Sequence, residues 1–163
     1  MPKVRAPALT IHQAEATANS RPVGLRIALM TLRLLENWRA HLGLDQDCAL
    51  IILATAAITM EKFTRLDFEP EHRDIRCTMP ADLLTRCNVS SIAAATGLNR
   101  ETARRKVQTL LSGGQLIADD KGSLRLSPEY TREVQTAEMM SSQLLTLVQT
   151  ANGLLKDNIL RAD

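Results

Sequence analysis

A chain of 163 residues that is 45% apolar and 23% charged is long enough for one ordinary hydrophobic core, and too short for two full-sized domains with a linker. Two Phe, one Trp and one Tyr are too few aromatic residues for a typical β-sandwich or barrel, so the composition favours packed helices. The net charge of +2 does not by itself indicate a nucleic-acid partner, and the distribution of the basic residues has to decide that question.

Cysteine usage and apolar runs bear on the cellular compartment. Cys48, Cys77 and Cys87 are widely separated and show no CxxC spacing, which predicts reduced thiols rather than a disulfide framework. Residues 1–22 contain no apolar run of the kind found in a signal peptide. The strongest apolar stretch, residues 48–58, is shorter than the roughly 20 residues that span a membrane. We therefore expect a cytoplasmic protein without a membrane partner.

The first half of the chain predicts an arm, two helices and a loop. Residues 1–22 contain prolines and small residues without periodicity, which indicates a mobile N-terminal arm. Apolar residues recur at helical spacing within residues 23–44, which predicts a helix with one broad buried face. Asp45 is placed to cap a following core helix that extends to about Leu66. Residues 67–80 are charged, contain two prolines and lack a period, so we expect a long loop.

Two short helices joined by a tight turn are predicted between residues 90 and 112. Ser90 is placed to cap an alanine-rich helix that ends at Gly97, where a positive φ is needed. Asn99 is placed to cap the next helix, residues 100–112, which Gly113 and Gly114 end. The apolar residues of this second helix share one face: Ala103, Val107, Leu110 and Leu111.

A β-hairpin is expected directly after the second helix. Apolar residues alternate within residues 115–119 and within residues 123–127, which predicts two short strands. Asp120, Lys121 and Gly122 form the turn between them. The order of helix, turn, helix and hairpin is that of a winged helix-turn-helix.

The segment from Ser90 to Pro128 resembles the DNA-binding module of the MarR-type and IclR-type bacterial transcriptional regulators. Ala93, four positions before the turn glycine Gly97, and Ala103, six positions after it, match small and inward-facing positions of those families. Lys106 departs from the pattern, because the families often have an apolar residue there. The resemblance implies a mainly α fold, a winged helix-turn-helix with a small β-hairpin wing. It also implies sequence-specific binding of duplex DNA, with the helix over residues 100–112 in the major groove.

The outward face of that helix supplies the candidate DNA-binding residues. Arginine suits this role because its planar guanidinium binds two acceptors of a guanine edge or of a phosphate. Arg100 in the first turn opposes the helix dipole, at a cost of roughly 0.3 to 1 kcal/mol that a bound phosphate or guanine would remove. We expect contacts to bases from Arg100, Thr102 and Arg105, and contacts to the DNA backbone from Ser91, Asn99, Arg104 and Lys106. Lys121 and Arg125 in the wing are further candidates, although Asp119 and Asp120 add negative charge there.

The flanking helices predict self-association. Ser127 is placed to cap a helix that opens with Pro128. The pattern then stays helical to about Leu160 and carries two apolar stripes, which one winged module cannot cover. We expect a winged helix domain at residues 45–128 and dimerisation helices at residues 23–44 and 129–163. A twofold homodimer would place two DNA-reading helices about one DNA turn apart. An intramolecular bundle without a partner is the alternative.

Three functions remain open at this point. No motif of a nucleophile elbow, a phosphate-binding loop, a dinucleotide site or a zinc protease occurs, so we expect no enzyme, no cofactor and no metal site. The chain could be a DNA-binding regulator, a winged-helix module for protein–protein interaction, or an effector-responsive regulator. In the last case an unknown small molecule would bind among the helices, near Met60, Met139 and Met140. A solvated, salt-bridged helix face would also account for the basic residues.

Overall fold

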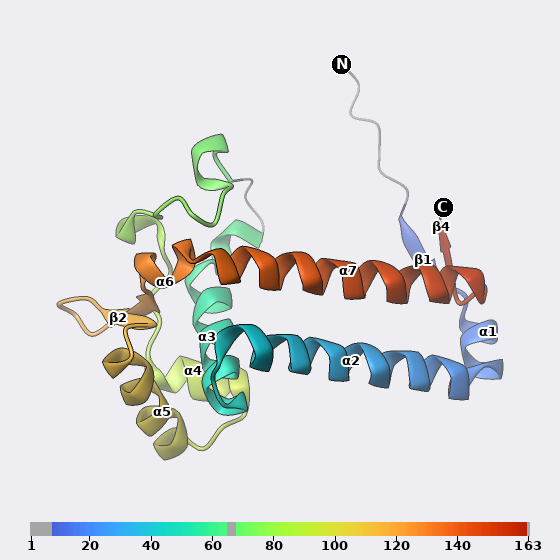
Figure 1. The fold of residues 1–163 in the computed structure, drawn as a ribbon, viewed down its shortest axis with the longest axis horizontal. Helices are drawn as coiled ribbons and strands as arrows, with labels where there is room; N and C mark the ends of the chain where they lie inside the picture. Colours follow the sequence, from blue (N-terminus) through green and yellow to red (C-terminus); the bar gives the residue numbers. More distant parts are fainter. Residues whose placement is uncertain (1–7, 65–67, 163) are drawn as a thin grey trace. The chain divides into compact units, whose positions relative to one another are not determined.

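The computed structural model describes residues 8–64 and 68–162, and these residues form two compact units. We call residues Trp38–Met139 the core unit, and residues 8–37 together with 140–162 the paired-helix unit. The chain is mainly helical, with two separate two-stranded antiparallel sheets (Figure 1), so the predicted mainly α fold class is confirmed. Each unit is described by itself.

The core unit is built around helix α3 (Gln46–Thr59). The Asp45 side chain caps this helix as predicted, by accepting a hydrogen bond from the Cys48 backbone N at 3.0 Å. Most of the helix is buried, and Ile51 and Thr55 are fully so. Helices α4 (Val89–Thr96) and α5 (Arg100–Ser112) pack against it. The predicted core helix is confirmed, although α3 ends at Thr59 and not near Leu66.

Helix α4 begins one residue after Asn88, so the predicted cap at Ser90 is wrong. The Asn88 side chain accepts a hydrogen bond from the Ser91 backbone N, and the Ser91 hydroxyl accepts one from the Asn88 backbone N, each at 3.0 Å. This reciprocal pair satisfies two backbone donors, which a cap at Ser90 would not do. Gly97 ends the helix with φ of 71°, the left-handed conformation that its position predicted.

A short hairpin follows α5, formed by β2 (Leu116–Ala118) and β3 (Leu124–Leu126). The two strands are antiparallel, with Ile117 opposite Arg125. The extended residues before α4 join the hairpin, because the Leu124 backbone N donates to the Cys87 carbonyl at 2.8 Å and the Cys87 backbone N donates to the Ser123 hydroxyl at 3.1 Å. The predicted hairpin is confirmed, with shorter strands.

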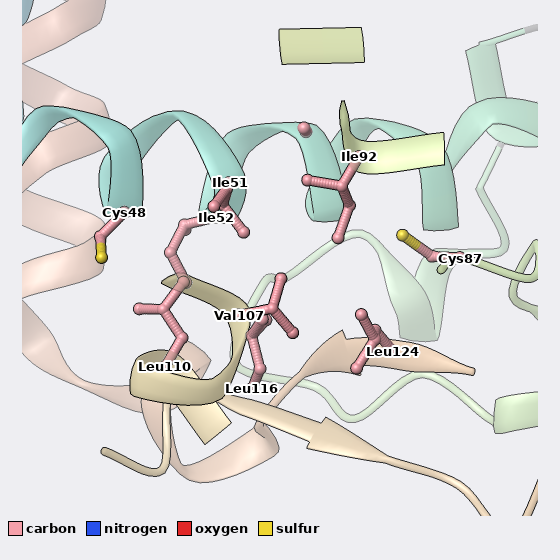
Figure 2. Packing of buried hydrophobic residues seen from close by; sticks show 10 residues of the cluster. Cys48, Ile51, Ile52, Cys87, Ile92, Val107, Leu110, Leu116 and Leu124 are labelled. Atoms are coloured by element: carbon pink, nitrogen blue, oxygen red, sulfur yellow. The ribbon is translucent and has the colours of Figure 1, made fainter. Parts of the chain in front are cut away.

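Side chains from α3, α4, α5 and the hairpin converge in one hydrophobic core (Figure 2). They include Ile51 of α3, Ile92 of α4, Leu110 of α5 and Leu116 of β2, none of them more than 1% exposed. Full burial of an aliphatic side chain of this size contributes about 1.5 to 3 kcal/mol. This core fixes the rotation of α5, and with it the side chains that α5 turns to solvent.

The core unit also contains three short 3₁₀ turns and helix α6. The turns are η1 (Glu61–Thr64), η2 (Pro70–His72) and η3 (Ala81–Leu83), and α6 (Pro128–Arg132) starts at the predicted cap Ser127. The described part of the expected loop, residues 68–80, contains η2 and is otherwise irregular, whereas residue 67 lies outside the described residues. The Arg132 guanidinium donates to the Thr78 hydroxyl and to the Arg76 carbonyl, which ties the loop to α6.

The paired-helix unit starts with β1 (Leu9–Ile11), α1 (Gln13–Ala18) and α2 (Ser20–Leu42), the last of which continues into the core unit. The prediction of a mobile arm is therefore wrong for residues 9–22, and residues 1–7 lie outside the described residues. Strand β1 pairs with β4 (Leu160–Ala162), and the His12 backbone N donates to the Ile159 carbonyl at 2.9 Å. Because these segments come from opposite ends of the sequence, no local pattern could indicate their pairing.

The expected continuous C-terminal helix is divided. Helix α6 ends at Arg132, the Glu133 backbone is extended with ψ of 139°, and α7 (Val134–Lys156) begins after it. Helix α7 ends before Asn158, whose φ of 57° is a left-handed conformation that asparagine tolerates. Strand β4 then replaces the predicted last helical turn, because residues 160–162 pair with β1.

One ion pair joins α2 to the residues that follow α7 in the paired-helix unit. Arg26 Nε donates a hydrogen bond to Asp157 Oδ2 at 2.8 Å, and Arg26 Nη2 lies 2.7 Å from the same carboxylate oxygen. Gly153 leaves room for it, since a Cβ there would lie 2.5 Å from Arg26 Nη1. Among the described residues, no single helix is long and apolar enough to cross a membrane. Helices α2 and α3 reach that length and apolar composition only when they are taken together as a bent pair.

Candidate nucleic-acid interface

The buried face of α5 determines which of its side chains reach solvent. Ala103, Val107 and Leu110 are buried as predicted, with at most 1% of their surface exposed. On the outward side, four residues in the first half of α5 are exposed: Arg100, Glu101, Arg104 and Arg105. Thr102 is half-buried at the edge of this surface. The α5 residues expected to contact bases and phosphates are therefore gathered on one side of the helix.

Arg100 and Arg105 are the unpaired cations of this surface. Among the described residues, neither guanidinium makes a hydrogen bond or an ion pair with a side chain. Arg100 lies in the first turn, where the positive end of the helix dipole repels it. Neither side chain is held by a hydrogen bond, so both can turn to an external anion, although the charge of Arg105 contributes, after that of Arg104, to the lowered pKa of Glu101.

Arg104 is held by an acidic neighbour one turn earlier. Its Nη2 and Nε donate to the two carboxylate oxygens of Glu101, at 2.6 and 3.0 Å. The hydrogen bond lowers the pKa of Glu101 and raises the pKa of Arg104. Both side chains are more than 60% exposed, so water and salt screen the pair and the stabilisation is slight. The ion pair offsets the charge of Arg104, and because it is weak, the guanidinium can leave Glu101 for another anion.

Lys106 is directed toward the start of α3. Its Nζ lies 2.8 Å from the Asp45 carboxylate, the same side chain that caps α3. This hydrogen bond is the largest cause of a raised pKa for Lys106 and of a lowered pKa for Asp45. Lys106 thus has a structural partner, which explains how a lysine occupies a position where the resembled families often have an apolar residue.

Two predicted backbone-contacting residues serve as helix caps. The Asn99 side chain accepts a hydrogen bond from the Glu101 backbone N at 2.9 Å, as its cap position predicted. The Ser91 hydroxyl is engaged in the capping box of α4 and also donates to the Asn88 carbonyl at 2.8 Å. Asn99 is exposed and Ser91 is half-buried. The side-chain oxygens of both residues are occupied, and both residues lie at helix N-termini, where backbone N–H groups favour an anion.

The turn of the hairpin presents Lys121 to solvent. The Asp119 carboxylate points into the turn, where it accepts hydrogen bonds from the backbone N of Lys121 at 2.9 Å and of Ser123 at 2.7 Å. These backbone hydrogen bonds, with that from Ser123 the largest cause, lower the pKa of Asp119. The negative charge expected to oppose DNA at the wing is therefore partly balanced by the turn itself.

Arg125 has a different setting from Lys121. It lies on β3, its side chain is half-buried, and its Nε is buried without a hydrogen-bond partner among the described residues. It lines a cavity in the core unit. This placement makes Arg125 a poorer candidate for a phosphate contact than Arg100, Arg105 or Lys121.

No family model, no curated protein and no solved structure matches the chain. The chemistry of the site therefore follows from its geometry alone. That geometry is an exposed helical surface with two arginines that have no hydrogen-bond or ion-pair partner among the described residues and a third in an exposed ion pair, together with an exposed lysine on the hairpin turn. Such a surface can bind phosphate groups and hydrogen-bond acceptors.

Arg86 is a further basic residue that the sequence did not single out. It is exposed and directly precedes Cys87, which is hydrogen-bonded to the hairpin. Its positive charge also lowers the pKa of Asp119, by less than the backbone hydrogen bonds do. Its position near the hairpin depends on the pairing of Cys87 with Leu124, which links residues far apart in the sequence. A basic residue just before the first of the two short helices, α4, was the one local signal.

Proposed function

We propose that the chain is a homodimeric transcriptional regulator that binds duplex DNA through α5, and that its core unit is a winged helix-turn-helix. The order of elements supports this fold: α4 and α5 are joined by a three-residue turn, Gly97 to Asn99, and the β2–β3 hairpin follows. An α-helix fits the major groove of B-form DNA, and in such folds the second helix presents its N-terminal residues to base edges. In α5 those residues are Arg100 to Arg105.

The observation that carries the proposal is that two arginines on the exposed side of α5, Arg100 and Arg105, have no hydrogen-bond or ion-pair partner among the described residues. A helix face stabilised only by its own ion pairs would leave few cations without a partner. Here Arg104 and Lys106 each have an acidic partner, whereas Arg100 faces the unfavourable end of the helix dipole. Phosphates or guanine edges in front of α5 would remove that conflict.

The burial pattern of the paired-helix unit supports a homodimer. Ile159 is the single large aliphatic residue buried there among the described residues. Large aliphatic side chains that remain exposed lie on α2, namely Leu25, Ile27, Leu29 and Leu32, and on α7, namely Leu144, Leu145, Leu147 and Val148. A surface of this kind marks an interaction site, and a second copy of the chain supplies an equal surface by twofold symmetry. The same symmetry supplies a second α5 for the DNA.

The test is fluorescence anisotropy of the full-length protein on a mixed-sequence duplex over a range of salt concentrations. Wild type should bind with an affinity that falls steeply with salt, because bound arginines release counterions from DNA. The double variant Arg100→Gln/Arg105→Gln should bind more weakly, and its log–log salt slope should be smaller by about one to two per subunit. Lys62→Gln, which removes one positive charge from η1, is the control for a change in net charge alone.

Two results would contradict the proposal. The first is wild-type protein that does not bind duplex DNA at low salt. The second is a double variant whose salt dependence equals that of the Lys62→Gln control. Either result would favour a winged-helix module for protein–protein interaction, and the basic surface would then be the place to seek an acidic partner.

A further inference from the structure

The core unit contains a cavity of about 270 Å³ that is remote in sequence from the basic residues of α5. Its walls come from the end of α3, the irregular residues 68–84, strand β3 and helix α6 (Figure 1 shows these elements). Small-molecule sites are concave, mostly apolar and typically about 300 to 1,000 Å³ in volume. The cavity is slightly smaller than the lower limit of that range, so its occupant would be small.

Most of the cavity wall is apolar. Six of its lining residues are Ala56, Met60, Phe68, Ile75, Met79 and Leu84. Only Met60 belongs to the methionines expected to line an effector site, since Met139 and Met140 are not part of this wall. A surface of this composition favours an apolar ligand body.

Two buried polar atoms interrupt the apolar wall. Arg125 Nε and His72 Nδ1 are both inaccessible to solvent and have no hydrogen-bond partner among the described residues. Both residues line the same cavity. A buried polar group without a partner costs free energy, and a charged one costs more, so a ligand that reaches these side chains and hydrogen-bonds to them would remove that cost.

The other charged groups at the cavity are already occupied. The Asp74 carboxylate pairs with the Arg76 guanidinium, and this hydrogen bond is the largest cause of lowering the Asp74 pKa to about 2. Arg73 Nε donates to the Phe68 carbonyl at 3.1 Å. Glu71 is largely exposed, with Oε1 3.7 Å from His72 Nε2. None of the described acidic residues therefore forms an ion pair with Arg125.

We propose that this cavity binds a small organic anion, with an apolar body and one carboxylate group, and that Arg125 and His72 hold the carboxylate. A carboxylate accepts two hydrogen bonds from one guanidinium, and charge-assisted hydrogen bonds of this kind are the strong ones. The imidazole of His72 adds a second donor in its Nδ1–H form. A neutral apolar ligand would fill the cavity and leave Arg125 unsatisfied, and a cation would meet the guanidinium unfavourably.

The site connects the ligand to the hairpin, because Arg125 lies on β3 opposite Ile117 of β2. Any effect of the ligand on DNA affinity would rest in addition on the function proposed above. Binding of the ligand itself does not, since the cavity and its two unsatisfied groups are independent of α5. The two proposals can therefore fail separately.

The experiment is isothermal titration calorimetry of the full-length protein, without DNA, using phenylacetate and its uncharged amide, phenylacetamide. The two probes share an apolar body and differ in the group that Arg125 would bind. Wild type should bind phenylacetate, with an affinity about tenfold or more above that for phenylacetamide.

Three variants locate the binding. Arg125→Gln should reduce the affinity for phenylacetate to that for the amide, and should fold normally because the half-buried guanidinium that it replaces forms no ion pair or hydrogen bond among the described residues. Ala56→Leu fills part of the cavity with a good helix former, and should weaken the binding of both probes. Arg39→Gln removes an exposed arginine that does not line the cavity, and should bind both probes like wild type.

Either of two results would overturn the proposal. One is wild-type protein that binds neither probe. The other is an Arg125→Gln variant, with a wild-type circular dichroism spectrum, that keeps the preference for the carboxylate. Loss of DNA binding with carboxylate binding intact would instead contradict only the function proposed above.

Discussion

The two units of the chain bury their apolar residues to very different extents. In the core unit, side chains from α3, α4, α5 and the hairpin fill one cluster, in which Ile51, Ile92 and Leu110 are fully buried. In the paired-helix unit, aliphatic residues of comparable size lie on α2 and α7 with about half of their surface exposed, for example Leu32 at 62% and Leu144 at 60%. Helices of both units carry large aliphatic side chains, and the difference lies in what covers those side chains.

This contrast separates a unit that is complete from one that lacks a layer. A helix must bury its apolar face against another element, and a domain needs two packed layers around a core. The core unit meets this condition within one chain and can keep its outer face polar. The described residues of the paired-helix unit do not meet it, apart from a β1–β4 pair, one ion pair and the buried Ile159. We expect the missing layer to come from a second chain.

The largest expected effect is on self-association. Wild type should be a dimer in size-exclusion chromatography with light scattering. Leu29→Asp/Leu144→Asp should be a monomer, with a dimer dissociation constant raised at least about a thousandfold, because each buried unpaired carboxylate costs several kcal/mol. Gln149→Asp, which adds the same charge at an exposed polar position of α7, should remain dimeric. A monomeric wild type would contradict the proposal that a second copy covers these helices.

The next effect compares one substitution in both units. Leu110→Ala, at a residue with 0% exposure, should lower the free energy of unfolding by about 2 to 5 kcal/mol at every protein concentration. Leu32→Ala, at 62% exposure, should act chiefly through the dimer, so its effect on the melting temperature should depend on protein concentration. Equal and concentration-independent losses from both variants would remove the distinction between the two units.

Local sequence signals were sufficient for most of the core unit. The rotation of α5 followed from the spacing of Ala103, Val107 and Leu110, and its cap from Asn99. Gly97 and Ser127 marked helix boundaries, because a left-handed residue and a side-chain cap each depend on a few neighbouring residues. Most elements defined by short-range interactions were therefore predicted correctly, although the cap of α4 is Asn88 and not Ser90.

Features that depend on distant residues were missed. Strand β1 forms only because residues 160–162 pair with it, so residues 9–11 alone suggested an arm. Lys106 looked like a phosphate contact until the fold brought Asp45 within hydrogen-bond distance. Arg125 lies between Leu124 and Leu126 on β3 and was expected to reach phosphates, whereas its side chain is half-buried and lines a cavity together with residues of 68–84 and α6. Periodicity identifies a face of an element, but it does not identify what covers that face.

A smaller effect on stability is expected at Asp45, which caps α3 and pairs with Lys106. Asp45→Ala should destabilise the protein by about 0.5 to 2 kcal/mol, because it removes the α3 cap as well as the ion pair with Lys106. Asp45→Asn keeps a capping side chain and removes only the charge, so its loss should be smaller. Asp47→Asn removes another carboxylate of the first turn and controls for the helix dipole.

The pH dependence of this pair has a defined sign. The pKa of Asp45 is lowered below its usual value of 3.8, chiefly by the hydrogen bond from Lys106. The charged carboxylate therefore stabilises the folded state above about pH 4, and the contribution is lost as the pH falls through the lower folded-state pKa. The stability difference between wild type and Asp45→Asn, measured by urea unfolding, should be constant near neutral pH and shrink below about pH 4. A difference that grows in acid would contradict this assignment.

The smallest effect on stability, and a sharp one on function, is expected from Glu101→Gln. The exposed pair with Arg104 contributes little to stability, so the melting temperature should stay close to that of wild type. The substitution frees Arg104 and removes a negative charge from the outward side of α5, so affinity for duplex DNA should rise by roughly threefold to tenfold at low salt. Glu61→Gln, at an exposed position of η1, is the matched control and should change affinity much less. An unchanged affinity in Glu101→Gln would mean that this side of α5 does not face the phosphates. The packing of the core unit would then stand, and the DNA-binding role proposed for its surface would not.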